Sequence, residues 1–309
     1  MPSGIVDAHN HLWIAPLEGT ADDVPVLDQF DALETELTAF RKIGGAAALD
    51  SQPGAGCGRN GHMLENLSIS SGIEIFACTG FHRRRYYPRG YYLFEVDPGT
   101  ARAHFLSEVE VGLEECVASQ HPVKAGYIKI AAGTSLADTP QGLMEAAVSA
   151  AAETDALLSV HTEQGACAEQ LLSALLKLGM RAERIMLCHM DKLADPGLHR
   201  ALAQSGALLE YDTFFRPKYH PETNAWPLLR SMREHGFLGA IAIGTDMADN
   251  TSWKSMGGEI GLPGMHTGLA LRLHQEGFSA EEIKAVQGRN LLARLQRPVG
   301  AETRSSHHA

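Results

Sequence analysis

The sequence predicts an α/β fold in which eight parallel strands close into a (β/α)8 TIM barrel. Short apolar runs typical of buried strands alternate with helical segments along the chain. A length of 309 residues suits one such barrel. Polar residues lie in or directly after five of the runs, and a closed barrel brings such strand ends together, whereas a doubly wound sheet has no closed interior.

Eight apolar runs have the length expected of buried strands, and each of the first seven is followed by a helical segment. The predicted strands are 5–9, 46–50, 73–80, 125–131, 157–162, 185–190, 207–213 and 240–246. The predicted helices are 28–44, 61–72, 97–117, 139–155, 167–179, 195–206 and 224–236. Several helices begin at Asp, Thr or Asn, or have Pro in the first turn, and several end at Gly.

The chain after the eighth strand predicts a Gly-rich loop over 257–268, and then two helical segments that end near Arg297. No linker or repeat marks a second domain. We therefore expect one domain over 1–298, and a disordered C-terminal tail over 299–309.

Composition and charge exclude several classes of protein. The net charge of −11 argues against a nucleic-acid partner, which would require a basic surface. No apolar run is long enough to cross a bilayer, and the N-terminus lacks the pattern of a signal peptide. The five cysteines show no CxxC spacing, which is typical of reduced thiols in a cytoplasmic protein.

Metal-ligand residue types recur in or after five of the predicted strands. In chain order they are His9, His11, Lys129, His161, His189 and Asp246. No single pair is specific, because a lone His at the end of a strand is usually only a polar residue with satisfied hydrogen bonds. The ordered series, delivered by separate strands, is specific: it predicts a binuclear metal centre at the C-terminal ends of the strands.

The two-residue period of a strand predicts which side chains face the barrel interior. Ile128 and Ile130 form the apolar outer face that packs on helices, so Tyr127 and Lys129 point inward. The same period leaves Cys188 on the outer face. It places the following pairs inside: Ser159 with His161, Leu187 with His189, and Gly244 with Asp246.

The candidate ligands suit divalent cations. Imidazole and carboxylate groups bind Zn²⁺ well, and Mn²⁺ or Co²⁺ suits the same donors. His9 and His11 are two residues apart, so both can bind one ion. A Lys ammonium would be repelled by the ions, and its burial carries a large desolvation cost. Carboxylation by CO2 resolves this conflict, because it converts the amine of Lys129 into an anionic carbamate able to bridge two metals.

This set of residues resembles that of the amidohydrolase superfamily, and in particular the phosphotriesterase family. The resemblance extends over the whole predicted barrel. It includes Thr79, Gly80 and Phe81 after the third strand and the segment from Cys57 to Asn60 after the second.

The resemblance implies a metal-dependent hydrolase. It implies that His9, His11 and Asp246 hold one ion, that His161 and His189 hold the other, and that carboxylated Lys129 bridges them together with a hydroxide. Asp246 is the expected catalytic residue, since it would accept the proton from the attacking water and relay it to the leaving group. The family also implies a homodimer.

Two basic segments at the predicted rim indicate an anionic small-molecule substrate. Arg216, Lys218 and Tyr219 are similar to a signature of family members that hydrolyse phosphorylated sugar lactones. The alternative for Arg216 and Lys218 is a surface ion pair with Glu210 or Glu222. The other segment contains His82 and a run of three arginines, Arg83, Arg84 and Arg85, which would attract an anion or else form only solvated loop contacts.

We therefore predict hydrolysis of a lactone or carboxylic ester, with an organophosphate triester or an N-acyl amide as the enzymatic alternatives. The non-enzymatic alternative is a barrel that has kept its fold as a binding protein. Metal identity and the exact substrate stay open at this stage.

Overall fold

The computed structural model describes residues 3–295, and the tail predicted over 299–309 lies outside this range. The strands are β1 Ile5–Asn10, β2 Gly45–Asp50, β3 Glu74–Phe76, β4 Cys78–Gly80, β5 Tyr127–Ala131, β6 Leu158–His161, β7 Ile185–Cys188, β8 Leu208–Tyr211 and β9 Ile241–Ile243. The helices are α1 Phe30–Lys42, α2 Gly61–Ser71, α3 Pro98–Glu110, α4 Gln141–Thr154, α5 Ala168–Lys177, α6 Pro196–Gln204, α7 Ala225–Glu234, α8 Gly261–Gln275, α9 Ala280–Lys284 and α10 Asn290–Leu295. Shorter helical turns lie in the connections.

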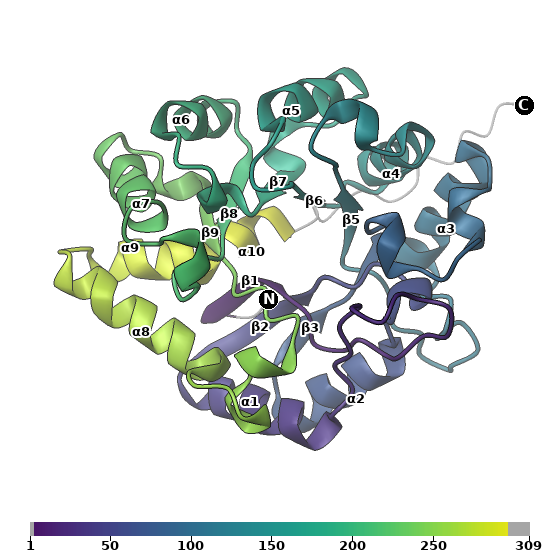
Figure 1. The fold of residues 1–309 in the computed structure, drawn as a ribbon, viewed down its shortest axis with the longest axis horizontal. Coiled ribbons are helices and arrows are strands. Elements are labelled where there is room, and N and C mark those ends of the chain that lie inside the picture. Colours follow the sequence, from purple (N-terminus) through teal and green to yellow (C-terminus); the bar gives the residue numbers. More distant parts are fainter. Residues whose placement is uncertain (1–2, 296–309) are drawn as a thin grey trace, which may run out of the picture.

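The strands are parallel and follow their order in the sequence, as the predicted TIM barrel requires. β3 and β4 form the single predicted strand 73–80, which is interrupted at Ala77. The ends of the sheet meet where the backbone N–H groups of Thr245 and Asp246 donate to the carbonyl of His9 at 3.0 and 2.8 Å. Figure 1 shows the strands at the centre and helices α1 to α8 in a ring around them.

Two apolar layers hold this architecture together. Strand residues such as Ile128 and Ile130 pack outward against the helices, as the strand period predicts. Residues such as Val6, Tyr127 and Met186 face inward and fill the barrel together with α10. Burial of both faces explains why these strands read as nearly continuous apolar runs.

The prediction of a Gly-rich loop over 257–268 is wrong for most of that range, because α8 begins at Gly261. The side chains of Leu262, Leu269 and Leu273 are buried along one face of this helix. Its first turn is capped from α1, since the carboxylate of Glu36 accepts the backbone N–H of Leu262 at 3.2 Å. Tertiary packing and a distant cap therefore override the low helix propensity of glycine.

Within residues 3–295, no helix is both long enough and apolar enough to span a membrane.

Candidate metal centre

Three candidate ligands from neighbouring ends of the sheet meet at the mouth of the barrel. Nε2 of His9 lies 3.7 Å from Oδ1 of Asp246, and Nε2 of His11 lies 3.5 Å from the same oxygen. A β-bulge in β1 orients His9. Asp7 pairs with Ala48 and Asn10 pairs with Asp50, so β1 contains one more residue than β2 between these two pairs. The additional residue allows His9 to turn inward although Ala8 already faces the interior.

The other two histidines meet each other directly. Nδ1 of His161, at the end of β6, lies 2.9 Å from Nε2 of His189, which follows β7. The predicted inner position of Leu187 and outer position of Cys188 are wrong, because Leu187 packs in the outer layer and Cys188 in the interior. His189 still faces inward because its backbone is left-handed, with φ of 64°, and this breaks the two-residue period of the strand.

Lys129 points into the barrel from β5, on the same face as Tyr127, as predicted. Its side chain is fully buried, and Nζ donates to the backbone carbonyl of Ser51 at 2.8 Å. Among residues 3–295, no carboxylate lies within ion-pair distance of this amine. A buried ammonium without a counter-ion carries a large desolvation cost.

Two further side chains orient the imidazoles. Nδ1 of His11 lies 2.7 Å from Oε1 of Gln52. Nδ1 of His189 is hydrogen bonded to the carboxylate of Asp212. In each case the bonded Nδ1 can hold the ring proton, so that the lone pair lies on Nε2, which is the arrangement that metal-binding histidines usually show. The lone pair of His189 then faces Nδ1 of His161.

The unpartnered nitrogens of this cluster fit metal ions. Both ring nitrogens of His9 and Nε2 of His161 are buried and lack a hydrogen-bond partner in the described structure. Burial lowers the pKa of His9 well below its usual value and lowers the pKa of His161 to about 3, so both rings are neutral. Neutral imidazole is the form that coordinates a metal, and one ligand atom each from His9, His11 and Asp246 lies within 4.8 Å of the others.

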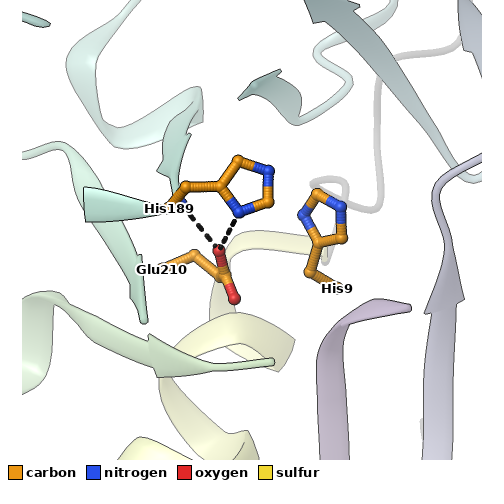
Figure 2. Close-up of side chains that lie close together, drawn as sticks. All are labelled: His9, His189 and Glu210. Carbon is orange, nitrogen blue, oxygen red and sulfur yellow. Dashed lines mark hydrogen bonds and ion pairs between the residues drawn. The ribbon is translucent and has the colours of Figure 1, made fainter. Parts of the chain in front are cut away.

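Glu210 adds a carboxylate beneath this cluster. Figure 2 shows it beside His189, with His9 across from both. Its Oε2 accepts the backbone N–H of His189 at 3.0 Å, and Oε1 has no partner within the described residues. Burial, and then the charges of Asp212 and Asp191, raise the pKa of Glu210 well above its usual value. One ligand atom each from His9, His189 and Glu210 lies within 4.8 Å of the others, so Glu210 is a further candidate ligand.

Asp246 is kept ionised by a cation on its outer side. Nη1 of Arg216 donates to Oδ2 of Asp246 at 3.0 Å, and Nη2 donates to the carbonyl of Thr245 at 2.9 Å. Burial raises the pKa of Asp246, but the positive charge of Arg216 outweighs burial and holds this pKa well below its usual value. Arg216 therefore pairs with neither Glu210 nor Glu222.

A second cation beside Asp246 was not predicted from the sequence. Nζ of Lys192 lies 3.9 Å from Oδ2 of Asp246 and 4.9 Å from the centre of the Tyr219 ring. The ammonium of Lys218 lies 5.0 Å from the same ring, but its side chain is exposed. Burial lowers the pKa of Lys192, but the carboxylates of Asp212 and Asp246 outweigh it and keep the amine charged. Lys192 thus places a buried positive charge close to the cavity.

The predicted arginine run lies farther out, and each of its members already has an acidic partner. Arg83 pairs with Glu163, Arg84 with Glu95 and Arg85 with Asp23. All three line a separate cleft at the rim. His82, by contrast, is buried and lines the cavity of about 140 Å³ in front of the candidate metal ligands.

Sequence reasoning therefore missed Lys192, Asp212, Gln52 and Glu210. A signal existed for two of them, because Glu210 in β8 and Asp212 directly after β8 are two residues apart, as inward-facing residues would be. Lys192 and Gln52 lie in connections, where no period predicts the direction of a side chain.

This chain is similar to known proteins over most of its length. The model of the phosphotriesterase family matches residues 3–290. The phosphotriesterase homology protein of Escherichia coli is 24% identical over 292 residues, covering 94% of this chain and 97% of that protein. A phospho-furanose lactonase of Mycoplasmopsis synoviae is 24% identical over 257 residues, covering 79% of this chain and 72% of that protein.

A solved structure shares the fold over nearly its whole length. The crystal structure of the Escherichia coli phosphotriesterase homology protein, complexed with phosphate in its active site, superposes with a TM-score of 0.86 at 23% sequence identity. The alignment covers 96% of this chain and 100% of that one. Because the family model spans the barrel from its first strand to its last helices, the chain belongs to the phosphotriesterase family.

Proposed function

We propose that this protein is a metal-dependent hydrolase that opens a lactone or cleaves a carboxylic ester carrying an anionic group, such as a phosphorylated sugar lactone. The observation that carries the proposal is the convergence of four histidines and Asp246 on one cavity, with buried ring nitrogens that lack partners in the described structure. A barrel that had kept only its fold would not need to retain this costly set of buried polar groups.

The same side chains would hold two divalent ions. His9, His11 and Asp246 would hold one, and His161 and His189 the other. Zn²⁺ suits these donors best, and Mn²⁺ or Co²⁺ is also compatible. When bound, such ions supply Lewis acidity and lower the pKa of water, which is the chemistry that ester hydrolysis at neutral pH requires.

Lys129 would complete the centre as a carbamate. Its amine nitrogen would attack the carbon of CO2, so that an N–C bond forms while one C=O π bond opens to a carboxylate oxygen, and the nitrogen would release its extra proton to water. The product carries one negative charge. The buried position of this amine and the lack of an acidic partner within residues 3–295 support the proposal. Carboxylation replaces an isolated buried cation by an anion that matches the cations it would bridge.

Asp246 would move the proton. Its carboxylate would accept a proton from the attacking water and return it to the oxygen of the leaving group. Arg216 supports this role because it keeps the carboxylate ionised and fixes its orientation.

Lys192, Arg216 and Tyr219 would bind the anionic part of the substrate. The two cations lie beside Asp246, and the phenol ring packs under the Lys192 ammonium. The names of two relatives agree with this chemistry, since one is a phospho-furanose lactonase and the other was crystallised with phosphate in its active site. His82 would contact the substrate from the wall of the cavity, next to His161.

Metal content and a substrate panel test the function. We expect about two divalent ions per purified chain, and loss of metal in Lys129→Ala. A Lys129→Arg variant is the matched control, because it keeps a buried cation but is not carboxylated. Sugar lactones with and without phosphate, an aryl ester, a phosphotriester and an N-acyl amide form the panel. Hydrolysis of the triester or amide alone would contradict the lactonase proposal, and a metal-free inactive protein would favour a binding function.

A further inference from the structure

The backbone holds the His82 ring in one tautomer. Nδ1 of His82 accepts a hydrogen bond from the backbone N–H of Arg83 at 2.7 Å. A nitrogen that accepts a hydrogen bond carries no proton, so the ring proton lies on Nε2. Protonation of Nδ1 would bring two N–H groups into direct opposition at this distance.

The position of the ring is as well defined as its tautomer. The backbone N–H of His82 donates to the hydroxyl of Tyr87 at 3.0 Å, which anchors the start of the loop. The ring packs edge-on against Tyr86, with centroids 4.4 Å apart, and lies 5.4 Å from the ring of His161. Within the part of the chain that the structure describes, no group is hydrogen bonded to Nε2.

The cavity wall therefore contains a fixed, uncharged hydrogen-bond donor. His82 lines the same cavity as His9, His11 and Asp246. A protonated Nε2 cannot coordinate a cation, so this histidine differs in kind from the four candidate ligands. His82 also differs from Lys192, because a neutral N–H group binds charged and uncharged acceptor oxygens alike, whereas an ammonium favours anions.

We propose that the Nε2–H group of His82 donates a hydrogen bond to a hydroxyl or ring oxygen of the bound substrate, and that this contact makes the protein select hydroxylated lactones over unsubstituted ones. This inference rests on the proposed lactonase function. An unsubstituted lactone would bury the N–H group without a partner, and a site built around a hydrogen bond discriminates strongly against a substrate that lacks the acceptor.

Two variants separate the donor from the ring. His82→Phe keeps an aromatic ring against Tyr86 and removes the donor. His82→Gln removes the ring and keeps an N–H donor. The measurement is kcat/KM for a pentono-1,4-lactone and for γ-butyrolactone, which shares the reacting ester but lacks the hydroxyl groups.

We expect His82→Phe to lose about 10- to 100-fold in kcat/KM on the hydroxylated lactone and less than about threefold on γ-butyrolactone. His82→Gln is expected to regain most of the loss. Equal losses on the two lactones, or His82→Gln behaving like His82→Phe, would overturn the inference. Metal content should stay that of the wild type in both variants.

A readout independent of activity separates this inference from the proposed function. Nitrogen-15 NMR of histidine-labelled protein, with the His82 signals assigned from the His82→Phe variant, reports which ring nitrogen carries the proton. We expect a neutral ring protonated at Nε2. A wild type that opens no lactone, phosphorylated sugar lactones included, would refute the lactonase function, whereas a proton on Nδ1 would refute the role of His82 whatever the activity.

Discussion

The hydrogen bond between Gln52 and His11 has a direction that the neighbouring backbone determines. Nε2 of Gln52 donates to the carbonyl of Cys57, so the amide oxygen must face Nδ1 of His11, 2.7 Å away. Nδ1 is then the donor, and the lone pair of Nε2 faces Asp246. A neutral amide orients His11, whereas the carboxylate of Asp212 orients His189, so the two candidate metal positions have unequal surroundings.

We predict that Gln52→Leu weakens metal binding about 10- to 100-fold, because His11 would lose the acceptor that orients it. Chelator competition followed by metal analysis measures this change. Gln52→Glu is the control, since it keeps an acceptor for Nδ1, and it should retain more metal than Gln52→Leu. Identical metal affinity in Gln52→Leu and the wild type would show that His11 does not depend on this contact.

The ion pair between Arg216 and Asp246 predicts a change in pH dependence. Arg216 lowers the pKa of Asp246 against the effect of burial, so its removal raises that pKa. The carboxylate would then be protonated at a higher pH, and the acidic limb of the kcat/KM profile should move to higher pH in Arg216→Met. Arg216→Lys should shift it less, because the charge remains. If the acidic limb of Arg216→Met did not move, then Asp246 would not be the group whose protonation limits activity at low pH.

Lys192 and Lys218 form a matched pair, because both ammonium groups lie about 5 Å from the Tyr219 ring and only Lys192 is buried beside Asp246. Lys192→Met should lower kcat/KM for a phosphorylated lactone about 10- to 100-fold and affect the neutral lactone much less. Lys218→Met should change neither by more than about twofold, because its charge is exposed to solvent. Equal effects of the two substitutions would place the anion site elsewhere.

Arg59 is expected to support the barrel rather than the chemistry. Its side chain is 0% exposed and pairs with Glu108, which is 1% exposed, and with Glu115. Arg59→Met would leave a buried carboxylate without its partner, at a cost of about 3–5 kcal/mol in the free energy of unfolding. Arg102→Met, which breaks an exposed pair with Glu153, should cost less than about 1 kcal/mol. Urea unfolding compares the two variants, and similar losses would contradict this assignment.

The two-residue period of a strand predicts the inward direction of Lys129 correctly but predicts the wrong face for Leu187. β5 stays regular through Lys129, so alternation determines which face each side chain occupies. β7 ends at Cys188, and the left-handed backbone of His189 then turns the ring inward. Local alternation cannot predict such a turn, because contacts with β8 stabilise it: Glu210 accepts the N–H of His189, and Asp212 binds its ring.

Glycine content misled the prediction for α8 for a similar reason. Intrinsic propensity favours a loop over 257–268, but Glu36 caps the helix from a segment more than 200 residues earlier in the chain. The same limit applies to Lys192 and Gln52, which reach the candidate centre from connections.

The sequence by itself determined the barrel and the identities of the histidines, the lysine and the aspartate around its mouth, because strand alternation and order along the chain are local properties. Only the tertiary structure decided which side chains orient those groups and which cations lie beside Asp246. Hydrogen-bond direction, burial and the balance of charge depend on groups brought together from distant segments, and these contacts exist only after the barrel has closed.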